Sequence, residues 1–275
     1  MDLNPQDHQT VRNVAREHEP DRYIAALIAP RAVRDDLIAL AAFAGEVSRI
    51  AKDVRDPLAG EIRLQWWRDT LKAGAEGARS GSPVADAFCE TIARHGLSLQ
   101  AIDDLLDAHA HTLYPAPPVD DDALRLEIDL KEGTLLRLAA HIVGAREDAL
   151  SEDLIADATQ AYGLTRVACD LPYALARGRV PLSEMRAPRD ITAKNAWQPA
   201  LAWIIFEARE YLSRAKRGYS VAPIPARSAL LPVALVEPYL KALEVSSRDP
   251  ARDIADIAPL TRMWRLYRAH ISGRI

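Results

Sequence analysis

The stretch YGLTRVACDLPYALARGRVPL, residues 162–182, joins a mostly apolar helical segment to a basic turn. It contains a single carboxylate, Asp170, and it ends in the turn made by Arg177, Gly178 and Arg179. A charge on an apolar helix needs a partner, because burying an unpaired charge is costly. A metal ion, a hydroxyl or an arginine can fill that role. Position 174, one turn after Asp170, is alanine, so the helix offers no second acid there.

The composition is that of a globular protein: 275 residues, 49% hydrophobic and 27% charged. The 35 basic and 39 acidic side chains give a net charge of −4, so no nucleic-acid partner is expected. The two cysteines, Cys89 and Cys169, form no CxxC pair, which argues against a disulfide scaffold or a thiolate zinc site and fits the cytoplasm. We expect no signal peptide and no membrane-spanning helix, and peripheral membrane contact stays open.

Apolar residues recur at helical spacing through most of the chain, and runs of alternating β-branched residues are nearly absent. We therefore expect an all-α protein. Proline, glycine and acidic capping signals divide it into roughly nine or ten helices around a central space. The expected helices cover residues 31–54, 58–72, 83–94, 99–113, 123–143, 151–176 (with a kink at Pro172), 198–217, 229–245 and 257–271.

Arg166 and Tyr173 lie on the same face of the predicted helix as Asp170, at spacings of four and three residues. In a functional interpretation, Asp170 binds a divalent ion or orients a diphosphate, and Arg166, Arg177 and Arg179 add positive charge. In a structural interpretation, Arg166 and Asp170 form an ordinary ion pair within the helix, with Tyr173 completing a hydrogen-bond network.

The segment GEIRLQWWRD, residues 60–69, is unusually dense in long polar and aromatic side chains. The adjacent Trp66 and Trp67 point about 100° apart on a helix, so one should pack in the core and the other at a cavity or an interface. Glu61 and Gln65 share a face that lines a cavity or meets solvent, and a structural network is as good an account as a substrate contact.

A third group consists of Tyr23 and Arg31, at the two ends of a short helix, which could approach one pocket. The alternative for these two residues is an ordinary split between core and surface.

The region LTRVACD (164–170) followed by RGRVPL (177–182) resembles the second aspartate-rich region of squalene and phytoene synthases. Residues 21–47, 133–144 and 227–244 are also similar to segments of that family, and the resemblance extends from about residue 20 to residue 270. It implies the all-α isoprenoid synthase fold, as one domain over residues 1–275 with an N-terminal extension at 1–19. The segment 60–69 is similar to a divergent branch that includes the mitochondrial assembly factor for respiratory complex I.

The chain departs from the family pattern at the residues expected to hold Mg²⁺. Ser48 and Lys52 stand where the two aspartates of the first motif are expected, and Ala174 stands where Asp170 should have its partner. Gly163 and Arg166 replace a glutamine and an asparagine of the second motif. Ionising a prenyl diphosphate needs carboxylate-bound Mg²⁺ to neutralise the leaving group, and Asp170 alone is a poor scaffold for several ions.

The resemblance therefore implies a protein with degenerate aspartate motifs that binds an isoprenoid or other lipid-like ligand, or a protein partner in an assembly role. The alternative is an active head-to-head prenyl diphosphate transferase with an altered site, for which Mg²⁺ would be the cofactor and Asp170 the metal ligand. The candidate residues are Asp170 for catalysis; Tyr23, Arg31, Arg49, Arg166, Tyr173, Arg177 and Arg179 for substrate; and Glu61, Gln65, Trp66 and Trp67 for a cavity or partner.

Overall fold

The computed structural model describes residues 4–145, 151–193, 195–245 and 249–275, and every regular element in these ranges is helical. The all-α prediction is confirmed. The α-helices are α1 (Pro5–His18), α2 (Pro20–Ile28), α3 (Arg34–Asp53), α4 (Pro57–Ala75), α5 (Pro83–His95), α6 (Leu99–His111), α7 (Asp121–Ile128), α8 (Thr134–Ile142), α9 (Glu152–Ala176), α10 (Gln198–Val221), α11 (Ile224–Ala229), α12 (Val236–Leu243) and α13 (Pro259–Ser272). Short helical turns are η1 (Arg31–Val33), η2 (Asp129–Gly133) and η4 (Leu231–Leu235).

Most helix starts carry a chemical signal in the sequence. Side-chain oxygens accept hydrogen bonds from the first free backbone N–H groups of α1, α4, α5, α6, α7 and α9, and the capping residues are Asn4, Asp56, Ser82, Ser98, Asp120 and Ser151. Proline occupies the first turn of α1, α2, α4 and α5, where its missing N–H costs nothing. These caps set where the helices begin, and the packing of the helices against one another provides most of their stability.

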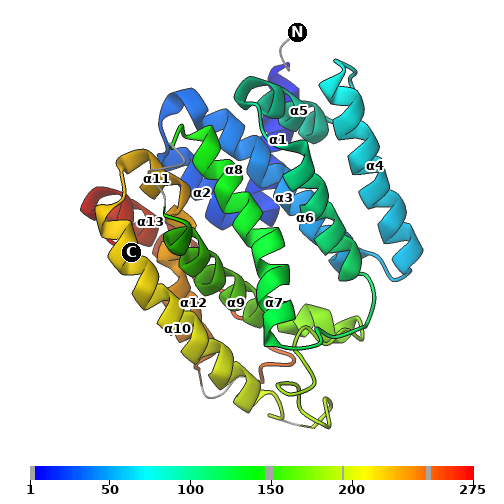
Figure 1. Ribbon diagram of the computed structural model, residues 1–275, viewed down its shortest axis with the longest axis vertical. Helices are drawn as coiled ribbons and strands as arrows, with labels where there is room; N and C mark the ends of the chain where they lie inside the picture. The colour runs from blue at the N-terminus through cyan, green and yellow to red at the C-terminus, as the bar shows by residue number, and fades with distance from the viewer. Residues whose placement is uncertain (1–3, 146–150, 194, 246–248) are drawn as a thin grey trace.

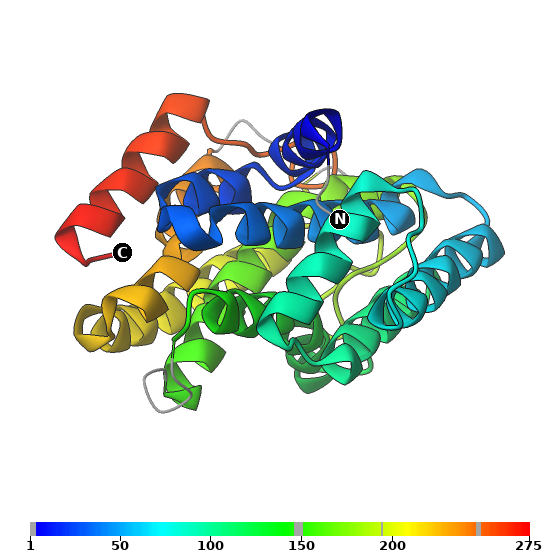
Figure 2. The same ribbon diagram turned by 90° about the horizontal axis from the view of Figure 1, so that it is seen from above.

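The centre of the bundle is formed by α3 and α9. Residues 36–45 of α3 are all buried, because α1, α2, α4, α5 and α8 surround this helix. Helix α9 packs along α10 and against η2. Both ribbon views place α4 and α13 at opposite ends of the molecule (Figure 1, Figure 2). The C-terminal parts of α3 and α9 carry Arg49, Lys52, Asp170 and Tyr173, four of the residues that the sequence singled out.

The structure corrects two expectations about the elements, and it adds a helix within the segment 1–19. This helix, α1, packs on α3 and α5, with Val11 and Ala15 buried. The expected helix 123–143 contains the widened turn η2 between α7 and α8. The expected helix 229–245 begins as α11 and the tighter turn η4 before α12, because Pro232 supplies no N–H for a regular helix there.

Candidate functional site

Asp170 pairs with Lys52 across the interface between α9 and α3. The Lys52 Nζ atom donates to the Asp170 carboxylate at 2.7 Å, and it also lies 5.3 Å from the centre of the Tyr173 ring. The two charged side chains are 29% and 39% exposed, so water still reaches both of them. The predicted partnership between Asp170 and Arg166 is therefore wrong, and the cation that neutralises Asp170 comes from α3.

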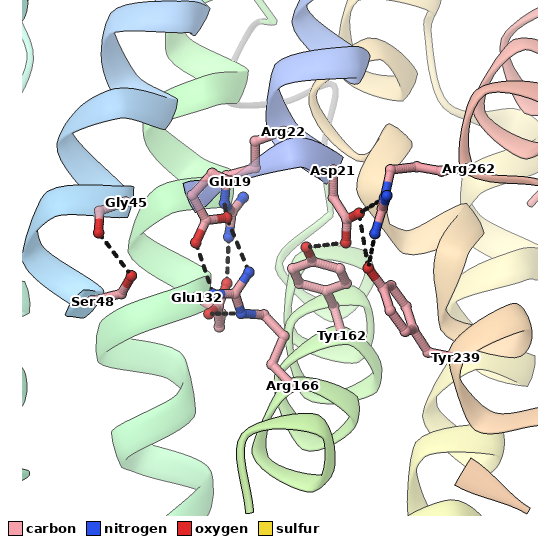
Figure 3. A network of polar contacts seen from close by, with 10 residues as sticks. All are labelled: Glu19, Asp21, Arg22, Gly45, Ser48, Glu132, Tyr162, Arg166, Tyr239 and Arg262. Atoms are coloured by element: carbon pink, nitrogen blue, oxygen red, sulfur yellow. Dashed lines mark hydrogen bonds and ion pairs between the residues drawn. The ribbon is translucent and has the colours of Figure 1, made fainter. Parts of the chain in front are cut away.

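The donor atoms around Asp170 do not fit a cluster of Mg²⁺ ions. Ser48 directs its hydroxyl to the carbonyl oxygen of Gly45 at 3.2 Å, within its own helix (Figure 3). Ala174 offers no ligand atom, and Lys52 brings a positive charge to the position where Mg²⁺ would need a carboxylate. Across the described ranges, no three His, Cys, Asp or Glu side chains come together in an arrangement that could hold a metal ion.

Arg166 belongs to a ring of four charged side chains, which we call the charge ring: Glu19, Arg22, Glu132 and Arg166 (Figure 3). Arg166 donates to both carboxylate oxygens of Glu19, at 2.9 and 2.7 Å, and its Nε atom lies 3.1 Å from Glu132. Arg22 closes the ring by contacting Glu132 and, at 3.3 Å, Glu19. Two cations and two anions cancel, which makes this buried group electrically neutral.

The charges of the ring depend on one another. Burial acts to lower the pKa of Arg166, but Glu19 and Glu132 together raise it well above its ordinary value. Burial likewise acts to lower the pKa of Arg22, but Glu132, Tyr162 and Glu19 together outweigh it and raise that pKa. Removing one member would leave the buried group with a net charge that one remaining counter-ion cannot cancel, which is costly.

A second polar cluster adjoins the charge ring and is organised by Asp21 (Figure 3). Its carboxylate accepts from Tyr162 at 3.1 Å, from Tyr239 at 3.0 Å and from Arg262 at 2.6 Å. Burial, followed by the charge of Asp21, raises the pKa of Tyr162 well above its ordinary value, so the phenol keeps its proton and donates. We call this group the Asp21 cluster. It joins α2, α9, α12 and α13.

Arg177 and Arg179 hold the C-terminal end of α3. Arg179 donates to the carbonyl oxygens of Ala51, at 2.6 Å, and Thr112, while Arg177 donates to that of Val54 at 3.2 Å. These carbonyls lie at helix ends, where no intrahelical donor reaches them. Both arginines also line an open hollow of about 480 Å³ with Val54, Pro57 and Leu113. The basic turn therefore has a structural task in this protein.

Arg49 lines a different hollow, of about 460 Å³, between α1, α3 and α4. Its guanidinium contacts Asp53 at 3.0 Å and donates to His18 Nε2 at 2.5 Å. Burial and the charge of Arg49 lower the pKa of His18, so the imidazole is neutral and accepts this bond. Trp66 and Trp67 line the same hollow, the latter with its ring centre 5.0 Å from that of Phe43. As expected, Trp67 is buried and Trp66 is exposed.

The remaining candidates lie apart from Asp170. Glu61 accepts from Tyr114 at 2.5 Å, and Gln65 donates to Asp69 on the exposed side of α4. Tyr23 is half-buried against the core. Arg31 is exposed in η1, which directly precedes α3. Lys52 is near the far end of that 20-residue helix, about 27 Å from its first residue at 1.5 Å per residue. The structure therefore does not bring Arg31 to Asp170.

Sequence reasoning missed Glu19, Glu132 and the partners of Asp21. The sequence singled out Asp21, Arg22 and Tyr23 as one group and assigned a role only to Tyr23, yet the two charged residues are the buried ones. Glu132 reaches the ring from η2, a widened turn that a plain helical period does not reveal. The signal that could have identified these residues is a charged residue at a position where the helical apolar pattern predicts burial.

Residues 15–268 match the model of the squalene/phytoene synthase family. The chain belongs to this family. A relative from Bos taurus, NADH dehydrogenase (ubiquinone) complex I, assembly factor 6, is 24% identical, over 83% of this chain and 71% of the relative. The same factor from Homo sapiens is 23% identical, over 86% of this chain and 74% of the relative.

Solved structures of the family share the fold. A dehydrosqualene synthase superposes with a TM-score of 0.78 at 15% identity, covering 97% of this chain and 96% of that enzyme. The squalene synthase HpnC from Alicyclobacillus acidocaldarius superposes with a TM-score of 0.67 at 18% identity, covering 98% and 94% of the two chains. These likenesses establish the isoprenoid synthase fold for this chain.

Proposed function

We propose that this protein is a family member with degenerate aspartate motifs, which binds an isoprenoid or other lipid-like ligand, or a protein partner, in an assembly role. The observation that carries the proposal is the 2.7 Å contact between Lys52 and Asp170. A prenyl diphosphate transferase must stabilise a departing diphosphate with metal-bound charge. Here the carboxylate that would hold the metal already has a fixed cation as its partner.

The charge ring supports the same conclusion. Arg166 is committed to Glu19 and Glu132, and Arg177 and Arg179 are committed to backbone carbonyls. Recruiting any of them to a diphosphate would break contacts that hold α1, α2, α3 and α9 together. The basic residues near Asp170 thus stabilise the fold instead of forming a free phosphate site.

The relatives named as complex I assembly factors favour an assembly role, and family membership favours a ligand with isoprenoid character. We further propose that the protein acts in the cytoplasm, with peripheral contact to a membrane. No nucleic-acid partner is proposed, in keeping with the net charge of −4.

The test is turnover by the purified protein. Farnesyl and geranylgeranyl diphosphate are supplied with Mg²⁺, and diphosphate release is followed against an Asp170→Asn variant. We expect no release above the level of the variant. Robust Mg²⁺-dependent release that the variant loses would overturn the proposal and establish a transferase with an altered metal site.

Ligand binding is tested separately by mass spectrometry of lipids extracted from the purified protein. A lipid-like ligand would be recovered in stoichiometric amount. Recovery of no lipid would leave only the protein-partner form of the proposal.

A further inference from the structure

The C-terminal helix α13 presents an apolar face to the outside of the molecule. This outer face of α13 consists of Leu260, Met263, Trp264, Tyr267 and Ile271, each between 52% and 78% exposed. At 100° per residue these five side chains fall within an arc of about 100°, so they form one continuous stripe. Isolated exposed apolar residues need no explanation, but a stripe that runs the length of a helix does.

The opposite side of α13 is already committed to the fold. Leu266 and Ala269 pack against Leu231 and Leu235 of η4, and Arg262 is buried in the Asp21 cluster. The helix therefore cannot rotate to hide its outer face. Both ribbon views show α13 at the edge of the molecule (Figure 1, Figure 2).

Positive charge flanks the stripe. No acidic side chain occurs in residues 259–275, whereas Arg265, Arg268 and Arg274 are present, and no ion pair to these three occurs among the residues that the structure describes. Arg268 lies about 80° to one side of the centre of the stripe and His270 about 80° to the other. This local excess of positive charge contrasts with the net charge of −4 for the whole chain.

We propose that the outer face of α13 docks onto a membrane that contains anionic lipids, with the helix axis parallel to the surface. Tyr and Trp side chains combine an apolar body with a polar edge, which suits the boundary between headgroups and acyl chains. Flanking arginines can lay their aliphatic stems along that boundary and keep their guanidinium groups among lipid phosphates. Helix α13 would thus lie in the interface and not cross it. No helix in the described ranges is long and apolar enough to cross a bilayer.

The charge around the outer face of α13 favours a membrane over a second copy of this chain as the partner of that face. A two-fold symmetric dimer through this stripe would bring the same face of both copies together. The arginines of one helix would then meet those of the other, and α13 carries no acid to pair with them. An anionic lipid surface supplies the missing negative charge across the whole face. This inference rests on the peripheral membrane contact proposed above and assigns it to one face, and it does not depend on whether the protein transfers prenyl groups.

Vesicle flotation of the full chain tests the proposal. We expect binding to vesicles of phosphatidylglycerol mixed with phosphatidylcholine, weaker binding to phosphatidylcholine alone, and release as salt screens the arginines. The double variant W264S/Y267S should weaken binding about tenfold or more, because two anchoring side chains are lost. The variant R268Q should weaken binding to the anionic vesicles and reduce its dependence on salt, because Arg268 flanks the stripe whereas Arg265 lies about 145° from its centre.

The matched control is L126S/F206S, which changes two side chains that are 60% and 62% exposed on α7 and α10. It should bind vesicles like the wild type. Circular dichroism melts verify that each variant folds. The proposal would be overturned if wild-type protein ignored anionic vesicles or if W264S/Y267S bound as well as the control. A dimer that W264S/Y267S abolishes, without any vesicle binding, would assign the face to a second copy instead.

Discussion

Lys52 and Asp170 lie 118 positions apart in sequence and meet at 2.7 Å in the fold. The pair occupies the place where the family resemblance leads one to expect carboxylates on both helices. Under the proposal of degenerate motifs, a lysine at the expected aspartate position would remove a metal ligand and add a cation that pairs with the remaining carboxylate.

The Lys52–Asp170 pair should contribute little to stability. Both side chains retain contact with water, and exposed ion pairs are typically worth less than about 1 kcal/mol. We expect Lys52→Met to lower the free energy of unfolding by less than about 1 kcal/mol in urea denaturation. A loss of several kcal/mol would mean that the pair is a structural element in its own right.

Arg166 should behave in the opposite way. Arg166→Met leaves Glu19 and Glu132 with Arg22 as their one cation in the ring and gives this buried group a net negative charge, which typically costs about 3–5 kcal/mol. The matched control is Arg12→Met, which breaks the exposed pair with Asp35 and should cost less than about 1 kcal/mol. Urea denaturation of both variants measures the difference. Equal losses would contradict the importance of the charge ring.

His109 should make the fold sensitive to acid. Burial, followed by the charges of Lys131, Arg166 and Lys52, lowers the pKa of His109 well below its ordinary value. Below about pH 6.5, His109 binds a proton in the unfolded chain but not in the folded protein, so the free energy of unfolding falls as the pH falls. We expect His109→Gln to reduce the loss of stability from about pH 7.5 to about pH 5.5, measured by urea midpoints.

The exposed His111 on the same helix provides the control for this titration. His111→Gln should keep the wild-type dependence of stability on pH. If His109→Gln also kept it, His109 would not be the group that senses the acid.

The helices α7 and α9 meet closely at Gly163, and this contact explains a residue that the sequence had only marked as unusual. A Cβ atom at position 163 would lie 2.2 Å from Cγ2 of Ile128, well inside van der Waals contact. The glycine is therefore required by packing, although glycine weakens a helix interior.

Gly163→Ala should destabilise the protein by about 1–3 kcal/mol, although alanine is the better helix former. The same substitution in an Ile128→Ala background should cost less, because the clashing side chain is gone. Thermal or urea denaturation of the four proteins in this cycle measures the coupling. Additive effects would rule out the close approach as the reason for the glycine.

The fold class and many helix boundaries were predictable from the sequence. The 3.6-residue period identified the all-α class, and the expected helices 83–94 and 99–113 begin at the same residues as α5 and α6. Partners were not predictable, because Arg166 meets Glu19 across 147 positions and Lys52 meets Asp170 across 118. The helical period predicts which face of its helix a residue occupies, but it does not predict which residues of another helix pack against that face.

At the scale of the whole molecule, the charged groups described above have three different roles. The charge ring and the Asp21 cluster, which includes Arg262 of α13, hold the buried centre, and the basic turn after α9 caps the end of α3. Arg265 and Arg268 of α13 have no ion-pair partner among the described residues. Helix α13 and the hollow lined by Trp66 and Trp67 lie toward opposite ends of the bundle, so a membrane at one end would leave the other free.

The most direct test of the central claim is calorimetric titration of inorganic diphosphate into the protein in the presence and absence of Mg²⁺. If Lys52 has taken the place of the metal ions at Asp170, Mg²⁺ will not strengthen diphosphate binding, and the wild-type and Asp170→Asn proteins will give the same result. Mg²⁺-dependent binding of diphosphate by the wild type, lost in Asp170→Asn, would contradict the claim.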